Sequence, residues 1–287
     1  MCILNFEEIV KRGLRIGNKY WDKYNSRHRS WEYCRGYFWD TYSKQKPIDK
    51  ELLCLNLAFY LTSWGMYRGS SALLFNDYQV HKDIIDILFD KNYDNLWNYN
   101  PFNDWQLNAL NNTTIFNKNG KIWAVYNEMH QKTNYPRKKS GKPEASATLI
   151  SKVLLGTWGC VPAYDTFFKK GVEYFGLSSD FTQKGLQEII LFLKDCPEVR
   201  RVISTYNKYT PMKIIDAYFW QLGFELSLLE LLNKKPDKKD YVANIFYYDD
   251  EREKVQVKDA KDLIEKIQAT HPIKNQKCNC DKYVEDK

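Results

Sequence analysis

Residues 144–171 read EASATLISKVLLGTWGCVPAYDTFFKKG, and this stretch decides how the chain folds. Apolar residues recur at helical spacing over residues 147–157, which predicts a helix with one buried face. Pro162 cannot continue that helix, so the residues around it must turn. Asp165 stands directly before the next apolar run, where a helix N-cap belongs. The stretch therefore predicts two helices joined by a loop, with one carboxylate held at the start of the second helix.

The order of residue types in this stretch resembles the helix-hairpin-helix DNA glycosylase superfamily. In that superfamily a helix ends in an apolar residue and a glycine, and a short loop with a proline leads to an aspartate that caps the next helix. The similarity spans residues 146–170 and implies hydrolysis of the bond between a base and its sugar in DNA, with Asp165 as the catalytic carboxylate. The matching residues are Thr148, Leu154, Leu155, Trp158, Gly159, Pro162 and Asp165.

Two features of the superfamily are missing from this sequence. A glycine-rich hairpin should precede Thr148, whereas residues 136–146 read PRKKSGKPEAS, with Gly141 as their only glycine. Some members use a lysine as nucleophile, and Ser146 occupies about the place where that lysine should lie. The resemblance therefore implies a monofunctional enzyme, which leaves an abasic site without a covalent bond between protein and DNA.

Asp165 has two interpretations. In the catalytic one, the carboxylate stays ionised, stabilises positive charge on the sugar and orients a water molecule. The target base must then leave the stacked duplex, and we expect Tyr37, Trp64 and Tyr164 to form the walls of its pocket. In the other interpretation, Asp165 only caps a helix. The protein is then a non-catalytic helical module that binds nucleic acid or another protein, for example a phage or antiviral defence protein.

Charge and aromatic content both suit a DNA partner. The net charge is +7, and 16% of the residues are aromatic. A charge run is also typical of a solvated surface, and aromatic residues also fill cores. Basic residues cluster in the loop before Thr148, where a following helix N-terminus is suited to bind phosphate. The residues that we expect to contact DNA are Arg68, Arg137, Lys138, Lys139, Lys142 and Lys152.

No sequence pattern indicates a cofactor, a metal site or a membrane span. The histidines, at positions 28, 81, 130 and 271, are scattered. Cys278 and Cys280 lack a second pair of ligands at zinc spacing, and no apolar run reaches about 18 residues. The seven cysteines are irregularly spaced and no secretory signal starts the chain, so we expect a cytoplasmic protein with reduced thiols.

Helical patterns separated by short loops predict a mainly α-helical, bundle-like fold. We expect a helical body over residues 1–233, with possible lobes at 1–130 and 131–233. A cleft between such lobes is a natural ligand site. A β-hairpin and a helix are predicted as an appendage at residues 240–269, followed by a mobile tail at 270–287.

Two expectations concern burial inside this body. The helix predicted over residues 51–67 is apolar nearly all round, which is typical of a central, buried helix. Asp216 lies in the long apolar helix predicted over residues 211–233. A buried carboxylate would need a partner, and we expect Asp216 on the exposed edge of that helix.

Overall fold

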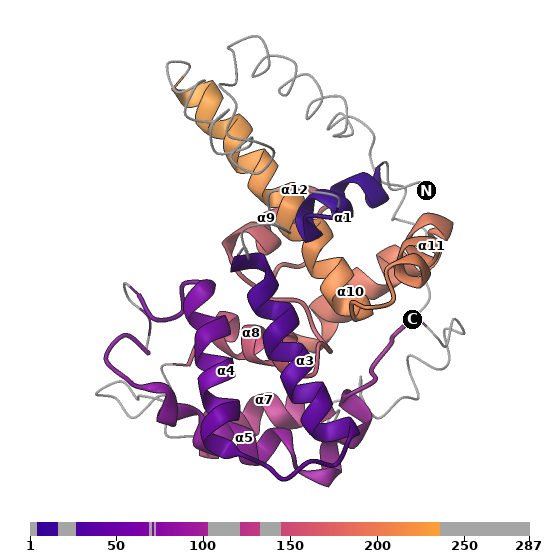
Figure 1. Cartoon of the computed structure of the whole chain (residues 1–287). Coiled ribbons are helices and arrows are strands. Elements are labelled where there is room, and N and C mark those ends of the chain that lie inside the picture. Colours follow the sequence, from indigo (N-terminus) through magenta and orange to yellow (C-terminus); the bar gives the residue numbers. More distant parts are fainter. Residues whose placement is uncertain are drawn as a thin grey trace.

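The computed structural model describes residues 5–16, 27–68, 71, 73–102, 121–132 and 145–235. The regular secondary structure of these residues is entirely helical, which confirms the predicted helical class (Figure 1). No helix within them is long and apolar enough to cross a lipid bilayer. The appendage and the tail that were predicted after residue 240 lie outside the described residues.

The helices follow the predicted order, and most of their ends fall within a few residues of the predicted positions. The α-helices are α1 (Phe6–Leu14), α3 (Ser30–Ser43), α4 (Lys50–Ser63), α5 (Lys82–Leu88), α7 (Lys121–Lys132), α8 (Ala147–Thr157), α9 (Thr166–Tyr174), α10 (Gln183–Lys194), α11 (Pro197–Thr205) and α12 (Pro211–Lys234). The described residues also form the short 3-10 helices η1 (Arg27–Arg29), η2 (Tyr78–His81) and η3 (Lys91–Leu96).

Local sequence signals explain where several helices begin and end. The Asp49 carboxylate accepts a hydrogen bond from the Leu52 N–H and caps α4, as predicted. Pro197 and Pro211 open α11 and α12, because the first turn of a helix needs no N–H at that position. Gly159 follows the end of α8 with a φ of 66°, a left-handed conformation that glycine adopts without strain.

Packing divides the helices into two groups (Figure 1). One group contains α3, α4, α5, α7 and α8, and the other contains α1, α9, α10, α11 and α12. The buried side chains of α1 pack against α11 and α12, so the first helix joins the last ones. The helices therefore group differently from the expected lobes 1–130 and 131–233. One continuous hydrophobic core extends through both groups.

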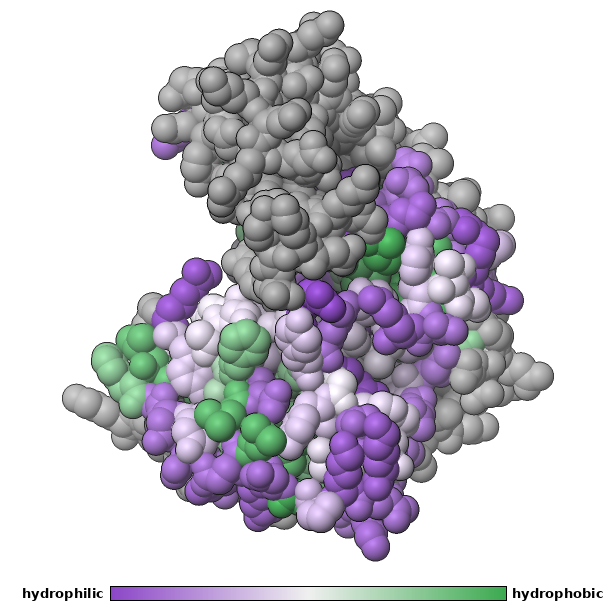
Figure 2. Space-filling view, viewed as in Figure 1, coloured by the Kyte–Doolittle hydropathy of each residue, from purple (hydrophilic) through white to green (hydrophobic). Residues whose placement is uncertain are grey.

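Two helices differ from the prediction in how much of their surface is buried: α8 is more buried than expected, and α4 is less buried. Every residue of α8 from Leu149 to Thr157 is buried, rather than one face, because α8 packs against α3 and α4 and also contacts the loop that leads to Asp165. By contrast, α4 was expected at the centre, yet Leu52, Leu55 and Phe59 are exposed along one side of it. Exposed hydrophobic residues are visible in Figure 2 in the lower half of the molecule, where α4 lies.

The helices α9 and α12 approach each other closely where they cross. Gly171 and Gly223 face each other's helix there, and a β-carbon at Gly223 would lie 2.8 Å from the amide nitrogen of Gly171. A β-carbon at either position would also overlap a backbone carbonyl oxygen of the other helix. The two glycines therefore set the distance between α9, which Asp165 caps, and α12, which carries Asp216.

Candidate active site at the junction of the two helix groups

Asp165 is the N-cap of α9, as predicted. Its Oδ1 atom accepts hydrogen bonds from the N–H groups of Phe167 and Phe168, each at 3.1 Å. The loop before it is bound to α8: the Thr148 hydroxyl donates to the Tyr164 carbonyl at 2.8 Å, and the Ser151 hydroxyl accepts from the Tyr164 N–H at 2.9 Å. Asp165 is therefore held by a buried helix as well as by its own.

Lys152 comes from the middle of α8 and reaches Asp165. Its Nζ atom lies 3.3 Å from Oδ2 of Asp165 and donates a hydrogen bond to the Trp64 carbonyl at 3.0 Å. The residue is 5% exposed. The structure therefore places Lys152, which we expected to contact DNA, beside Asp165 in the interior. The sequence did contain a signal for this pairing. Lys152 lies within an otherwise apolar helix, and a charge that is buried with such a helix needs a partner of opposite charge.

A second ion pair lies beside the first. The Lys213 Nζ atom is 2.8 Å from Oδ2 of Asp216, and Oδ1 of Asp216 accepts from the Ala163 N–H at 3.0 Å. Asp216 is buried, so its expected place on an exposed edge is wrong, because α12 packs against the loop before Asp165. Burial raises the pKa of Asp216, while Lys213 and the Ala163 N–H act in the opposite direction.

These two lysines and two aspartates surround a narrow cleft. Its other lining residues are Tyr60, Trp64, Leu155, Ala163 and Trp220. The cleft has a volume of about 10 Å³, which is about the room that one water molecule needs. The side chain of Asp165 remains 16% exposed, more than those of Lys152 and Asp216. Asp165 is therefore the more exposed of the two carboxylates in this cluster.

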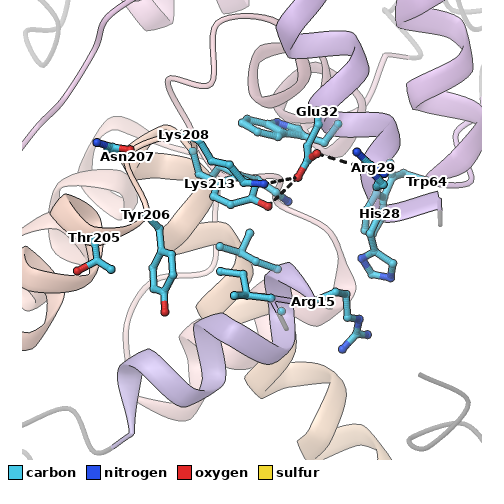
Figure 3. Close-up of a pocket in the computed structure, with 15 residues that line it drawn as sticks. Arg15, His28, Arg29, Glu32, Trp64, Thr205, Tyr206, Asn207, Lys208 and Lys213 are labelled. Atoms are coloured by element: carbon cyan, nitrogen blue, oxygen red, sulfur yellow. Dashed lines mark hydrogen bonds and ion pairs between the residues drawn. The ribbon is translucent and has the colours of Figure 1, made fainter. Parts of the chain in front are cut away.

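A larger cavity of about 410 Å³ adjoins the cleft, and Trp64 and Lys213 line both. Figure 3 shows side chains from several separate segments arranged around this first cavity. The cations are Arg15, Arg29, Lys208 and Lys213, and the aromatic residues are His28, Trp31, Trp64, Tyr206 and Tyr209. Among the described residues, Glu32 is the only carboxylate that lines this cavity. It lies 3.3 Å from Lys208 and 3.7 Å from Arg29.

Trp64 and Lys213 form the boundary between cleft and cavity. The Trp64 ring makes edge contacts with His28 and Trp220, with ring centroids 5.3 and 5.9 Å apart. The Lys213 ammonium lies 5.8 Å from the Trp31 ring and 5.7 Å from the Trp64 ring, within the range of cation–π attraction. A ligand in the first cavity would therefore meet both aromatic rings and positive charge.

The other predicted site residues lie elsewhere. Tyr164, which we expected as a pocket wall, is fully buried against Phe168 and Phe181 and lines neither the cleft nor the first cavity. Tyr37 is a half-buried residue of α3 and lines neither the cleft nor the first cavity. Arg68 is exposed. The remaining predicted DNA contacts, Arg137, Lys138, Lys139 and Lys142, lie outside the described residues.

No protein-family model, curated protein or solved structure matches this chain. Within the part of the chain that the structure describes, no group of three or more His, Cys, Asp or Glu residues is arranged to hold a metal ion.

Proposed function

We propose that the protein is a monofunctional DNA glycosylase-like enzyme that hydrolyses the N-glycosidic bond of a damaged or modified base. The observation that carries the proposal is the position of Asp165. Its carboxylate is held by two backbone N–H groups at the edge of a cleft with room for one water molecule, next to a cavity of ligand size. A carboxylate and a water molecule facing a sugar are the groups that glycosidic hydrolysis requires.

The first cavity supplies the second requirement, which is a place for a base outside the duplex. A base that has left the stack needs aromatic or apolar surfaces on which to lie. Trp31, Trp64 and Tyr209 line this cavity, and its volume of about 410 Å³ falls in the range of small-molecule sites. Arg15, Arg29 and Lys208 add positive charge, which suits the phosphates that flank a flipped nucleotide.

Lys152 and Lys213 have supporting roles in this proposal. Each ammonium is ion-paired with an aspartate in a low-dielectric setting, which keeps the four-residue cluster formally neutral. The nitrogen that attacks a sugar in a Schiff-base mechanism must carry a free lone pair. An ammonium held by a carboxylate has none, so the geometry favours hydrolysis over strand cleavage.

The alternative is a binding module in which Asp165 has a structural role only. It is supported by the fact that both oxygens of Asp165 already have partners: Oδ1 accepts two N–H groups and Oδ2 faces Lys152. In this case the protein binds nucleic acid or another protein through the first cavity without chemistry.

Base release separates the two functions. Duplex DNA carrying one damaged or modified base at a defined position is incubated with the protein and then treated with alkali, which cuts abasic sites. If the protein is a monofunctional glycosylase, the DNA strand breaks at that position after the alkali treatment and not before it. A panel of oxidised, deaminated and alkylated bases and of hypermodified pyrimidines that leaves every strand intact, in the presence of measurable DNA binding, favours the binding module.

A further inference from the structure

A second cavity of about 520 Å³ lies beside the first one. The two cavities share five lining residues: Trp31, Glu32, Asn207, Lys208 and Tyr209. The second cavity is otherwise formed by residues of α3, including Arg35 and Gly36, by residues 97–100, and by Thr210 and Pro211 at the start of α12. The two cavities therefore adjoin along the segment that contains Lys208 and Tyr209.

Arg35 is a half-buried cation without a counter-ion among the described residues. Its Nη2 atom donates to the Trp97 carbonyl at 3.1 Å, and its guanidinium carbon lies 4.9 Å from the Trp39 ring and 5.7 Å from the Trp97 ring. Its Nε and Nη1 atoms are buried and have no hydrogen-bond partner in the part of the chain that the structure describes. Burial lowers the pKa of Arg35 to about 10, so the side chain remains positively charged at neutral pH.

The surroundings of Arg35 do not compensate this charge. Glu32 is one turn away on α3 but interacts with Arg29, with Lys208 and with the Tyr209 hydroxyl, which donates to it at 2.7 Å. The indole Nε1 of Trp97, another residue that lines this cavity, is also buried without a partner among the described residues. Donors without acceptors, one of them charged, are costly to bury. A ligand that supplies negative charge would remove that cost.

We propose that the second cavity is a nucleotide-binding site. The phosphate would interact with Arg35 and Lys208, and the base would stack on the aromatic side chains and face the amides of Asn98 and Asn207. This inference extends the proposed function: a strand whose target base occupies the first cavity would place a neighbouring nucleotide in the second. The same chemistry also fits a free mononucleotide, and the experiment distinguishes these two sources.

Gly36 allows the cavity to be blocked without disturbing the fold. It is an exposed residue of α3 that lines only the second of these two cavities, and a β-carbon there would meet no atom within 4 Å. Gly36→Phe therefore introduces a bulky side chain at the cavity, and Gly36→Ala is the matched control. Arg35→Gln removes the charge, whereas Arg35→Lys keeps it.

The measurement is a titration followed by the indole N–H signals of ¹⁵N-tryptophan-labelled protein. One arm uses the four deoxynucleoside 5′-monophosphates, and the other uses single-stranded trinucleotides. We expect shifts of the Trp39 or Trp97 signal, assigned by Trp39→Phe and Trp97→Phe, and binding at least about tenfold weaker in Gly36→Phe and in Arg35→Gln. Gly36→Ala should bind within about twofold of the unmodified protein.

Binding of a mononucleotide would show that a free nucleotide is a sufficient ligand for the second cavity. Binding of the trinucleotide alone would show that the ligand is a nucleotide within a strand. The inference is overturned if neither probe shifts these signals at millimolar concentration, or if Gly36→Phe binds as tightly as Gly36→Ala. Asp165 does not line this cavity. Nucleotide binding can therefore fail while base release succeeds, and base release can fail while nucleotide binding succeeds.

Discussion

Lys152 and Asp165 connect the two helix groups through one ion pair, with Nζ 3.3 Å from Oδ2. Lys152 belongs to α8 and Asp165 caps α9, which belong to different groups. The lysine also donates to the Trp64 carbonyl at the end of α4. A change in the charge of Asp165 is therefore expected to affect stability as well as any chemistry, and a test of function must separate the two.

Asp165→Asn is the first prediction. Asn and Asp cap helices about equally well, but the substitution leaves Lys152 buried without its carboxylate, so we expect a lower melting temperature. In the catalytic interpretation, single-turnover base release falls roughly 100-fold or more, because charge stabilisation in a site with little water is worth several kcal/mol. Asp49→Asn is the control, since it changes an aspartate cap of the same kind at an exposed helix start.

The double variant Lys152→Met with Asp165→Asn removes both charges of the pair. Replacing a buried ion pair by neutral groups is often tolerated, whereas removing one partner is not. We therefore expect the double variant to melt at a higher temperature than Asp165→Asn while base release stays as low. Recovery of base release together with stability would show that Asp165 acts only as a structural residue.

The second prediction concerns the amine next to Asp165. Because Lys152 is ion-paired and also donates to the Trp64 carbonyl, we expect no covalent adduct when the protein and its DNA substrate are mixed with borohydride. Only an amine forms the Schiff base that borohydride reduces. The measurement is a gel that separates free protein from cross-linked protein. An adduct that disappears in Lys152→Gln would instead identify Lys152 as a nucleophile and the enzyme as a strand-cutting one.

The position of Asp165 was predictable from sequence because a cap is a local feature. Pro162, the apolar run after Asp165 and the hydrogen bonds of a helix N-terminus all lie within a few residues of it. The partners of Asp165 were not predictable in this way. Lys152 is 13 positions earlier on a separate helix, and its pairing with Asp165 depends on how α8 meets α9.

Burial was the other quantity that sequence patterns did not determine. An apolar helix such as α4 can lie at an edge, and a helix with a lysine in its middle such as α8 can lie at the centre. The difference arises from which helices cover them. In the same way Asp216 is buried because the loop that leads to Asp165 covers that side of α12, with the Ala163 N–H bound to its carboxylate.

The third prediction tests the crossing that positions Asp165 against Asp216. Gly171→Ala and Gly223→Ala each introduce a β-carbon that overlaps a backbone carbonyl oxygen, and backbone cannot move as a flexible side chain can. We expect each to lower the free energy of unfolding by about 1–3 kcal/mol. Gly36→Ala in α3 is the control and should raise it by up to about 1 kcal/mol, because alanine favours helix and its β-carbon has open space. Chemical denaturation measures the free energy of unfolding of all three variants. If the three substitutions change it equally, the close approach of α9 and α12 is contradicted.

The last prediction is a pH dependence of stability that originates at His81. This residue of η2 is fully buried, and its Nε2 atom lies 2.8 Å from the Tyr67 hydroxyl. Burial lowers the pKa of His81 to about 3, whereas a histidine in an unfolded chain has a pKa of about 6.5. Between these two values the unfolded chain binds a proton that the folded protein does not. The contribution of His81 to stability is therefore complete above about pH 6.5 and is lost as the pH falls towards 3.

From pH 7.5 to pH 5 this difference lowers the free energy of unfolding by about 2 kcal/mol. Stopping at pH 5 keeps the measurement above the range in which Glu7, Asp40 and Glu51, whose pKa values are lowered by ion pairing, take up protons. His81→Gln is the control, because glutamine does not titrate and its carbonyl can accept from Tyr67. Denaturant unfolding at both pH values should show the stability of the unmodified protein falling by about 2 kcal/mol more than that of the variant. Equal losses in the two proteins would mean that His81 is protonated in the folded state, and therefore that water reaches it.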